Sequence, residues 1–210
     1  SRRTDVKSPD GRIEVFFTND GDHPQYAVNV DGRELILPSA LGIVSDQWNF
    51  DSRKARVSAE FSQKDTLWNQ PWGENKIVRE NYREMAVNMA DSISKLTIRF
   101  RVFDDGMAFR YEWKVDGVDT IAVTDEVTEF NFAANGTSWS IPGNFETYEL
   151  EYRNLALTDV EDANTPFTFR TETGVYGSIH EAALYDYPEM TLKRSPEGGL
   201  KANLAPLPDG

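Results

Sequence analysis

Two alternating runs joined by a short turn, between residues 96 and 113, constrain the fold of this chain most. The apolar positions recur at every second residue, as in Leu96, Ile98, Phe100 and Val102, then in Met107, Phe109, Tyr111 and Trp113. Side chains of a β-strand alternate between the two faces of a sheet, so this period is typical of half-buried strands. The Asp105-Gly106 pair between the runs favours a tight hairpin, because glycine adopts positive φ without a steric penalty.

The same signals recur along the chain and predict an all-β fold. Alternating apolar residues stand in segments 13–17, 26–30, 35–37, 55–61 and 128–132, separated by Asp-Gly and Asn-Asp turns. Sustained helical periodicity is missing, and His180–Leu184 is the best candidate for a short helix. We expect the longest loops at Gln63–Glu74 and Asp159–Thr165. These features predict one antiparallel β-sandwich domain over residues 1–210, with few short helices.

Composition narrows the classes of function. The net charge of −13 argues against nucleic acid and against an anionic membrane as partners. The chain has no cysteine and no apolar run long enough to span a bilayer. It begins at Ser1 and closes on a Pro-rich stretch, residues 203–210, so we expect a piece of a longer protein whose linker starts there.

The usual catalytic signatures are missing. The only two histidines are His23 and His180, and the sequence holds no Gly-x-Ser-x-Gly elbow, Walker loop or Gly-x-Gly-x-x-Gly motif. Carboxylates remain, notably Glu146, Glu149 and Glu151 within residues 144–152. On a strand Glu149 and Glu151 share one face and Glu146 takes the other. The acidic group is either a solvated strand edge or a source of oxygen ligands for a hard cation such as calcium.

A second candidate segment runs from Trp68 to Glu74 and combines two tryptophans with amide side chains. Aromatic faces stack on sugar rings and amides bond sugar hydroxyls, so the segment suits carbohydrate binding; alternatively, the tryptophans cover one end of the sandwich. We take Trp68, Trp72, Glu74 and Glu146 as substrate-binding candidates. No catalytic pair of carboxylates is named, because a choice among 35 acidic residues would be arbitrary.

Several segments in order resemble the N-terminal domain of glycoside hydrolase family 97, a family of α-glucosidases and α-galactosidases. They are Ser8–Gly11, Leu41–Ile43, Pro71–Glu74, Arg101–Tyr111, Tyr148-Glu149, and Glu181-Ala182 followed by Asp186–Pro188. The resemblance covers nearly the whole chain. It implies a galactose-mutarotase-like β super-sandwich that packs against a following (β/α)₈ barrel, which holds the catalytic carboxylates.

The resemblance also implies a function. This domain would support an exo-acting α-glycosidase, complete the pocket for an α-linked oligosaccharide and supply Glu149 as a ligand for an active-site calcium that the barrel completes. The 210 residues alone would be inactive, and the location would be periplasmic or secreted. One alternative is an autonomous carbohydrate-binding module that uses Trp68 and Trp72. Another, a free-standing mutarotase-like epimerase, lacks the base and acid it needs, since only two histidines are present.

Overall fold

The computed structural model describes residues 3–71, 76–143, 151–180, 190–196 and 198–205. Strands dominate these residues, and the only helical segments among them are the 3-10 turns η1 (Ser52–Lys54) and η2 (Leu157–Asp159), so the all-β antiparallel prediction is confirmed. No helix in the described residues has the length and apolar character to cross a membrane. The chain forms two compact units, residues 1–34 with 50–119 and residues 35–49 with 120–210.

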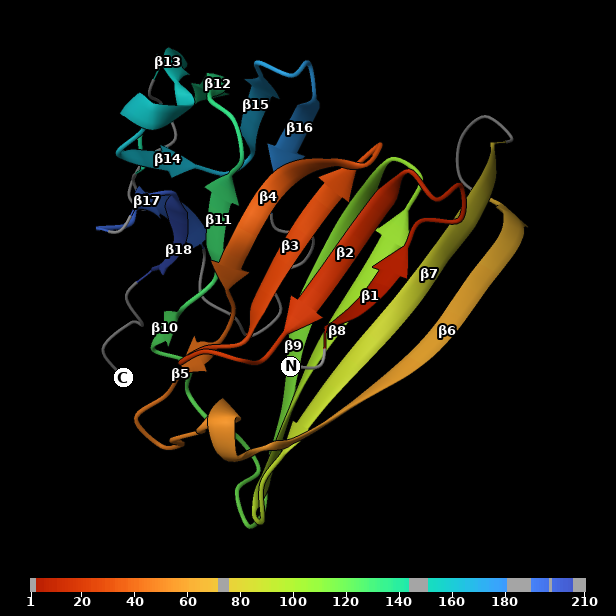
Figure 1. Cartoon of the computed structure of the whole chain (residues 1–210), viewed down its shortest axis with the longest axis vertical. Coiled ribbons are helices and arrows are strands. Elements are labelled where there is room, and N and C mark those ends of the chain that lie inside the picture. Colours follow the sequence, from red (N-terminus) through yellow and green to blue (C-terminus); the bar gives the residue numbers. More distant parts are fainter. Residues whose placement is uncertain (1–2, 72–75, 144–150, 181–189, 197, 206–210) are drawn as a thin grey trace. The chain divides into compact units, whose positions relative to one another are not determined.

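Unit 1 consists of two antiparallel layers (Figure 1). One layer holds β1 (Thr4–Lys7), β2 (Ile13–Thr18) and β3 (Gln25–Val30), and the other holds β6 (Arg56–Asn69), β7 (Ile77–Ala90), β8 (Ser94–Phe103) and β9 (Gly106–Val115). Their facing side chains form a core in which Phe17 and Phe100 are almost completely buried, with ring centroids 6.4 Å apart. Burying each such side chain contributes about 1.5–3 kcal/mol, so these alternating apolar residues hold the two layers together.

The hairpin predicted at residues 96–113 is present as β8 and β9, but its turn lies one residue earlier than expected. Phe103 pairs with Gly106, so Asp104 and Asp105 form the two-residue connection and Gly106 belongs to β9. Gly106 does not have the positive φ that we predicted. The backbone N–H of Asp10 donates to Asp104 Oδ1 at 2.9 Å, which fixes the turn against the segment that precedes β2.

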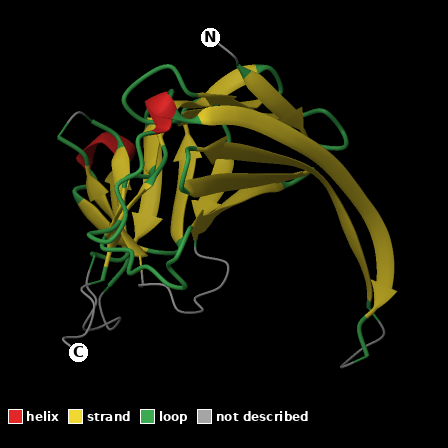
Figure 2. Cartoon of the chain, turned by 90° about the horizontal axis from the view of Figure 1, so that it is seen from below, coloured by secondary structure: helices red, strands yellow, loops and turns green. Residues whose placement is uncertain are grey.

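The loop predicted at Gln63–Glu74 is wrong over its first half, because β6 continues to Asn69. Strand β7 pairs with β8 only from Tyr82 onward, whereas its earlier residues pair with β6 alone. Residues 65–69 and 77–81 therefore form a two-stranded ribbon, which curves away from β8 (Figure 2). We refer to these residues as the β6–β7 ribbon.

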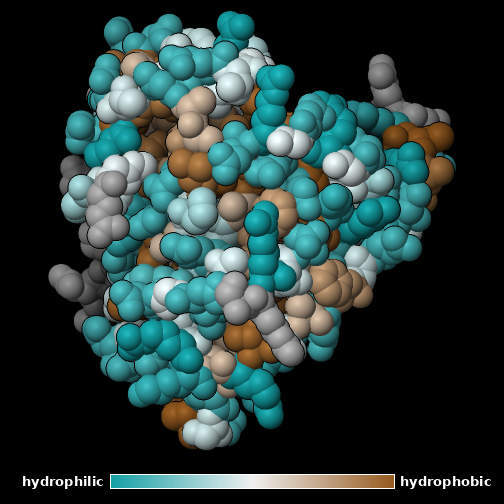
Figure 3. Space-filling view, in the orientation of Figure 1, coloured by the Kyte–Doolittle hydropathy of each residue, from teal (hydrophilic) through white to brown (hydrophobic). Residues whose placement is uncertain are grey.

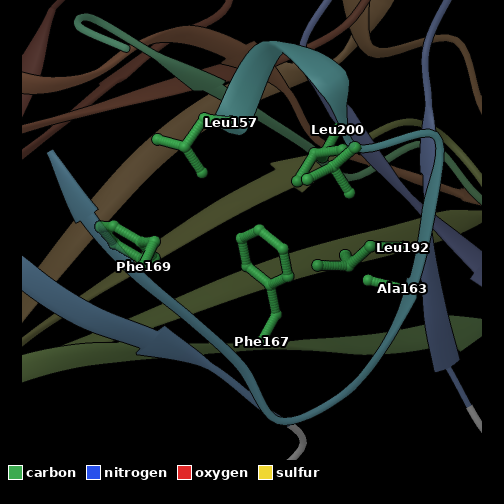
Figure 4. Close-up of a cluster of buried hydrophobic side chains, with 7 residues drawn as sticks. Leu157, Ala163, Phe167, Phe169, Leu192 and Leu200 are labelled. Atoms are coloured by element: carbon green, nitrogen blue, oxygen red, sulfur yellow. The ribbon is translucent and has the colours of Figure 1, made fainter. Parts of the chain in front are cut away.

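Unit 2 contains two antiparallel sheets and one short strand pair. In the first sheet, β4 (Arg33–Ala40), β11 (Glu129–Phe132), β18 (Leu200–Leu204), β17 (Met190–Arg194) and β14 (Asp162–Asn164) are neighbours in that order. The second orders β13 (Arg153–Ala156), β12 (Gly136–Ser140), β15 (Phe167–Thr171) and β16 (Tyr176–Ile179), and β5 (Ile43–Val44) pairs with β10 (Asp125–Glu126). A buried cluster that includes Phe167, Phe169, Leu192 and Leu200 forms the core (Figure 4).

Two further local predictions change in unit 2. Asp159–Thr165 is not a loop throughout, because η2 ends at Asp159 and β14 occupies Asp162–Asn164. Strand β18 includes residues 203 and 204, which we expected to begin a linker. His180 lies in no regular element, and the remainder of the predicted helix at His180–Leu184 is outside the described residues.

Candidate functional site

The acidic segment that carries Glu146 and Glu149 belongs to the connection between β12 and β13. The last pair of this hairpin joins Ser140 to Arg153, so residues 141–152 link the two strands. Glu146 and Glu149 themselves lie outside the described residues, whereas Glu151 is described and exposed. The predicted roles of Glu146 and Glu149 therefore remain predictions. Within the described parts of the chain, no group of three or more acidic or histidine side chains could hold a metal ion.

Both ends of this connection are tied to β14. Arg153 Nη2 donates to the backbone oxygen of Asp162 at 2.6 Å and to its Oδ1 at 3.2 Å. At the other end, the backbone N–H of Asn164 donates to the oxygen of Ile141 at 2.8 Å. Hydrogen bonds to charged groups contribute about 1.5–3 kcal/mol, so Arg153 is the stronger of the two anchors. The base of the segment is thus fixed on the neighbouring sheet.

Polar atoms are buried at the same base. Ser140 is fully buried, and neither its Oγ nor Arg153 Nε has a hydrogen-bond partner in the part of the chain that is described. Gly143, just before the acidic residues, lies so close to Asp162 that an added Cβ would be 3.2 Å from the Asp162 Cβ. Leaving a polar atom buried without a partner costs about 1–3 kcal/mol. The polar base of this segment therefore lowers the stability of the fold.

The tryptophan segment begins on the β6–β7 ribbon. Trp68 lies on β6, opposite Val78, and is 48% exposed. Trp72 and Glu74 lie outside the described residues. The predicted grouping of Trp68 with Trp72 and Glu74 therefore remains a prediction. Trp68 itself is accessible to solvent. Apolar atoms gather at the upper right of the space-filling view, over the far ends of β6 and β7 (Figure 3).

Two ion pairs link β6 to β7 along the ribbon, and one of them includes Lys64, the residue that precedes the ribbon on β6. Arg79 makes two hydrogen bonds to the carboxylate of Asp65, at 2.9 and 2.8 Å, and Lys64 lies 2.6 Å from Glu80. The hydrogen bonds from Arg79 keep the pKa of Asp65 below its ordinary value. Both pairs are diagonal cross-strand pairs, and they lie on opposite faces of the ribbon because residues 64 and 65 alternate. The charges of the ribbon thus compensate one another.

Sequence reasoning missed a network of five charged residues on the outer face of β7, β8 and β9, opposite the core. Glu84 is buried and accepts hydrogen bonds from Arg99 and Arg101, both at 2.6 Å. Arg99 also makes two bonds to Glu112, at 3.0 and 3.1 Å, and Arg110 donates to Glu112 at 2.8 Å. Arg110 and Glu112 lie two residues apart on β9, and Glu112 is also bonded across the strands to Arg99, which is diagonal to it.

The network neutralises charges that would otherwise repel. Arg99 lies directly opposite Arg110 on the neighbouring strand, a like-charge pair that destabilises a sheet unless it is compensated. Burial alone would raise the pKa of Glu84, but the bonds from Arg101 and Arg99 outweigh it and lower that pKa. The bonds from Arg99 lower the pKa of Glu112 as well. Both carboxylates are therefore ionised and hydrogen-bonded to arginine side chains, which suits a structural role better than proton transfer.

These features define an antiparallel β-sandwich domain with candidate ligand-binding segments on two hairpins. The family model for the N-terminal domain of glycosyl hydrolase 97 matches residues 6–207, and the chain belongs to this family.

Known relatives of the chain are glycosidases. A retaining α-galactosidase of Bacteroides thetaiotaomicron is 25% identical to it, over 97% of this chain and 32% of the relative. A glycoside hydrolase family 97 enzyme from Pseudoalteromonas sp. strain K8, solved with panose and also with acarbose, is 35% identical with a TM-score of 0.89, over 97% of this chain and 32% of that one. A β-arabinopyranosidase, 22% identical with a TM-score of 0.84 over 95% of this chain and 35% of that one, shares the fold. The chain thus spans about a third of the length of these relatives.

Proposed function

We propose that this chain is the N-terminal β-sandwich domain of an exo-acting α-glycosidase, an α-glucosidase or α-galactosidase, and that it supports a catalytic barrel and completes the pocket for an α-linked oligosaccharide. The observation that carries the proposal is the family match over residues 6–207, combined with relatives about three times as long that are glycosidases. The panose and acarbose complexes of one relative support an α-linked substrate. A periplasmic or secreted location is part of the same proposal.

Within this function, Glu149 supplies one ligand to a calcium ion. Calcium takes about six to eight oxygen ligands, and carboxylates are suitable donors. In this proposal the remaining ligands come from the catalytic part, because one carboxylate cannot fill the coordination sphere of calcium. The bound ion would supply a positive charge that polarises the site. Arg153 and Asp162 anchor the base of the segment that carries Glu149, while Trp68, Trp72, Glu74 and Glu146 contribute to the pocket.

The test uses the polypeptide extended to the length of the relatives, assayed on chromogenic α-glucosides and α-galactosides with calcium and with a chelator. We expect activity that the chelator removes, and none from the 210 residues alone. Glu149→Gln should lower activity and weaken calcium binding in calorimetry. Glu151→Gln is the matched control, because Glu151 is exposed, carries the same charge and lies two residues away. Equal effects of the two substitutions, or turnover by the 210 residues alone, would contradict the proposal.

The exposure of Trp68 favours a second candidate function, an autonomous carbohydrate-binding module. Stacking on a ring that is 48% exposed requires no rearrangement of the core. Calorimetry of the 210 residues with panose and with maltooligosaccharides distinguishes the two functions. Binding that is lost in Trp68→Ala and Trp72→Ala, but kept in Tyr152→Ala, supports the module. Tyr152 is a suitable control because it is also an exposed aromatic residue, 66% accessible.

A further inference from the structure

The second sheet of unit 2 has one face in the core and one face directed outward. Phe167 and Phe169 of β15 and Ser138 of β12 are buried, so the residues that alternate with them lie on the outer face. Residues directly opposite each other across strands share a face, which extends the outer surface over β12, β15 and β16 (Figure 1). We call this surface the aromatic face, and it consists of Thr137, Trp139, Thr168, Arg170, Tyr176 and Ser178.

Two aromatic rings of this face have nearly parallel planes. Trp139 on β12 and Tyr176 on β16 lie on either side of β15, with an interplanar angle of 9° and ring centroids 6.4 Å apart. Carbon atoms in direct contact are about 3.5–4 Å apart, so the two rings do not cover one another. Tyr176 is 65% exposed and Trp139 is half-buried. The pair therefore offers ring surface to a ligand on the outside of the sheet.

The backbone around Tyr176 fixes the direction of its ring. The next residue, Gly177, faces the core, because a Cβ at that position would collide with the ring of Phe169. The turn before Tyr176 is closed by two hydrogen bonds, from Thr171 N–H to the oxygen of Val175 at 2.9 Å and from Val175 N–H to Thr171 Oγ1 at 3.1 Å. A side chain that is already positioned loses little conformational freedom when a ligand binds.

The composition of the aromatic face indicates the chemistry of its ligand. Acidic residues make up 35 of the 210 residues of the chain, yet this face has none, and its one charge is the Arg170 guanidinium, 5.3 Å from the centroid of the Tyr176 ring. Hydroxyl groups of Thr137, Thr168 and Ser178 share the face. Aromatic planes accept the C–H face of a pyranose ring, while hydroxyl and guanidinium groups bond its hydroxyls.

The charge of the whole chain argues against two other occupants. The net charge of −13 repels an anionic ligand, and it also opposes association with a second copy of the chain. A neutral ligand rich in hydroxyl groups meets no such repulsion.

We infer that the aromatic face of β12, β15 and β16 binds a neutral α-linked oligosaccharide in the enzyme. The inference rests on the proposed function for the class of sugar. It adds a sugar-binding surface in unit 2 to the candidate segments that carry Trp68 and Glu149. By holding part of a long substrate, this surface lowers the KM for oligosaccharides and leaves that for short glycosides unchanged.

The first experiment locates the sugar by NMR. The five tryptophans of the 210-residue chain give separate indole N–H signals, and Trp139→Phe identifies that of Trp139. The chain is titrated with maltoheptaose and with stachyose, which distinguish glucose from galactose oligomers. We expect the Trp139 signal to shift with one of them, with a dissociation constant of roughly 1 mM, because a ligand on an open face is buried from one side only. Tyr176→Ala should weaken this binding by about tenfold or more.

Two variants control this experiment. Tyr176→Phe keeps the ring and should retain binding. Trp68→Ala removes an exposed tryptophan of unit 1 and should leave the shift of the Trp139 signal unaltered. Circular dichroism checks that each variant is folded. A Trp139 signal that responds to neither sugar would overturn the inference, as would equal losses of binding in Trp68→Ala, Tyr176→Ala and Tyr176→Phe.

The second experiment separates this inference from the proposed function. In the extended polypeptide, Tyr176→Ala should raise the KM for the oligosaccharide that binds, while kcat and the KM for a short chromogenic glycoside stay unchanged. An active enzyme in which the substitution changes neither KM would overturn the inference and retain the proposed function. Binding at Trp139 by an extended polypeptide that hydrolyses no glycoside would retain the aromatic face as a sugar site and reject the enzymatic function.

Discussion

Replacing Glu84 by glutamine removes one charge from the middle of the network on β7, β8 and β9 and leaves the size of the side chain almost unchanged. Glu84 accepts hydrogen bonds from Arg99 and Arg101, and its side chain is only 8% exposed. After the substitution, Arg99 keeps its two bonds to Glu112, whereas Arg101 keeps only its position over the ring of Tyr82. The perturbation therefore leaves Arg101 without a hydrogen-bonded carboxylate.

The expected magnitude follows from the exposure of the three groups. Breaking a fully buried ion pair from one side costs about 3–5 kcal/mol, because the remaining charge stays in a dry environment. Arg99 and Arg101 are 26% and 35% exposed, so water solvates part of their charge and screens part of this cost. We expect a loss of about 2 kcal/mol, near the lower end of the range for hydrogen bonds to charged groups. For a chain of this size that loss corresponds to a fall in Tm of roughly 4–8 °C.

Thermal unfolding followed by circular dichroism measures the effect. Glu80→Gln is the matched control, since Glu80 is 33% exposed, lies on the same strand and forms its ion pair with Lys64. An exposed pair of that kind contributes about 0.2–1 kcal/mol. Equal falls in Tm for the two variants would refute the reasoning, because burial of Glu84 would then have no measurable consequence. A Tm for Glu84→Gln above that of the wild-type chain would refute it as well.

Three other outcomes follow from the described contacts. Phe100→Ala empties a fully buried site in unit 1 and should destabilise the chain by about 3–5 kcal/mol in urea denaturation, whereas Ile93→Ala should have little effect. Gly136→Ala should cost about 1–3 kcal/mol or more, because a Cβ at this position meets the backbone of Arg170, while Gly174→Ser, whose site is open but has positive φ, should be milder. The lowered pKa values of Glu84 and Glu112 stabilise the fold above the unfolded value of about 4.3, and this contribution disappears as the pH falls through the lower folded values. Between about pH 5 and pH 3 the Tm of the wild-type chain should therefore fall more than that of Glu84→Gln, and parallel curves would contradict this assignment.

The parts of the fold that sequence predicted best are those in which one face of a strand is buried. Strands β8 and β9 show strict alternation because Ile98 and Phe100 face the core while Arg99 and Arg101 face outward. The turn between them was misplaced by one residue, since either Asp104-Asp105 or Asp105-Gly106 supplies a suitable two-residue connection. The register between β8 and β9 decides which of the two dipeptides forms the turn. The residues of the turn do not by themselves determine that register.

The ribbon could not be predicted because nothing in the described structure buries either of its faces. Residues 63–66, read Gln-Lys-Asp-Thr, carry no apolar alternation, and pairing with β7 holds them extended. The Glu84 network was missed for a related reason. Its members come from three strands, so only the cross-strand register shows that Glu84 lies opposite Arg101 and near Arg99. An acidic residue within an otherwise apolar strand indicates that an ion pair forms there. The sequence does not specify which basic residue is its partner.

The order in which the ribosome synthesises the two units affects folding during translation and the choice of truncation points. Residues 35–49 belong to unit 2, yet they are synthesised before the greater part of unit 1, residues 50–119. Ile36 of β4 is buried in the finished protein, and its partner Phe132 on β11 is synthesised almost a hundred residues later. A nascent chain that stops at Asp119 therefore lacks this partner strand. No single cut in the sequence divides the chain into the two units, so any truncation point between residues 34 and 120 leaves at least one unit incomplete.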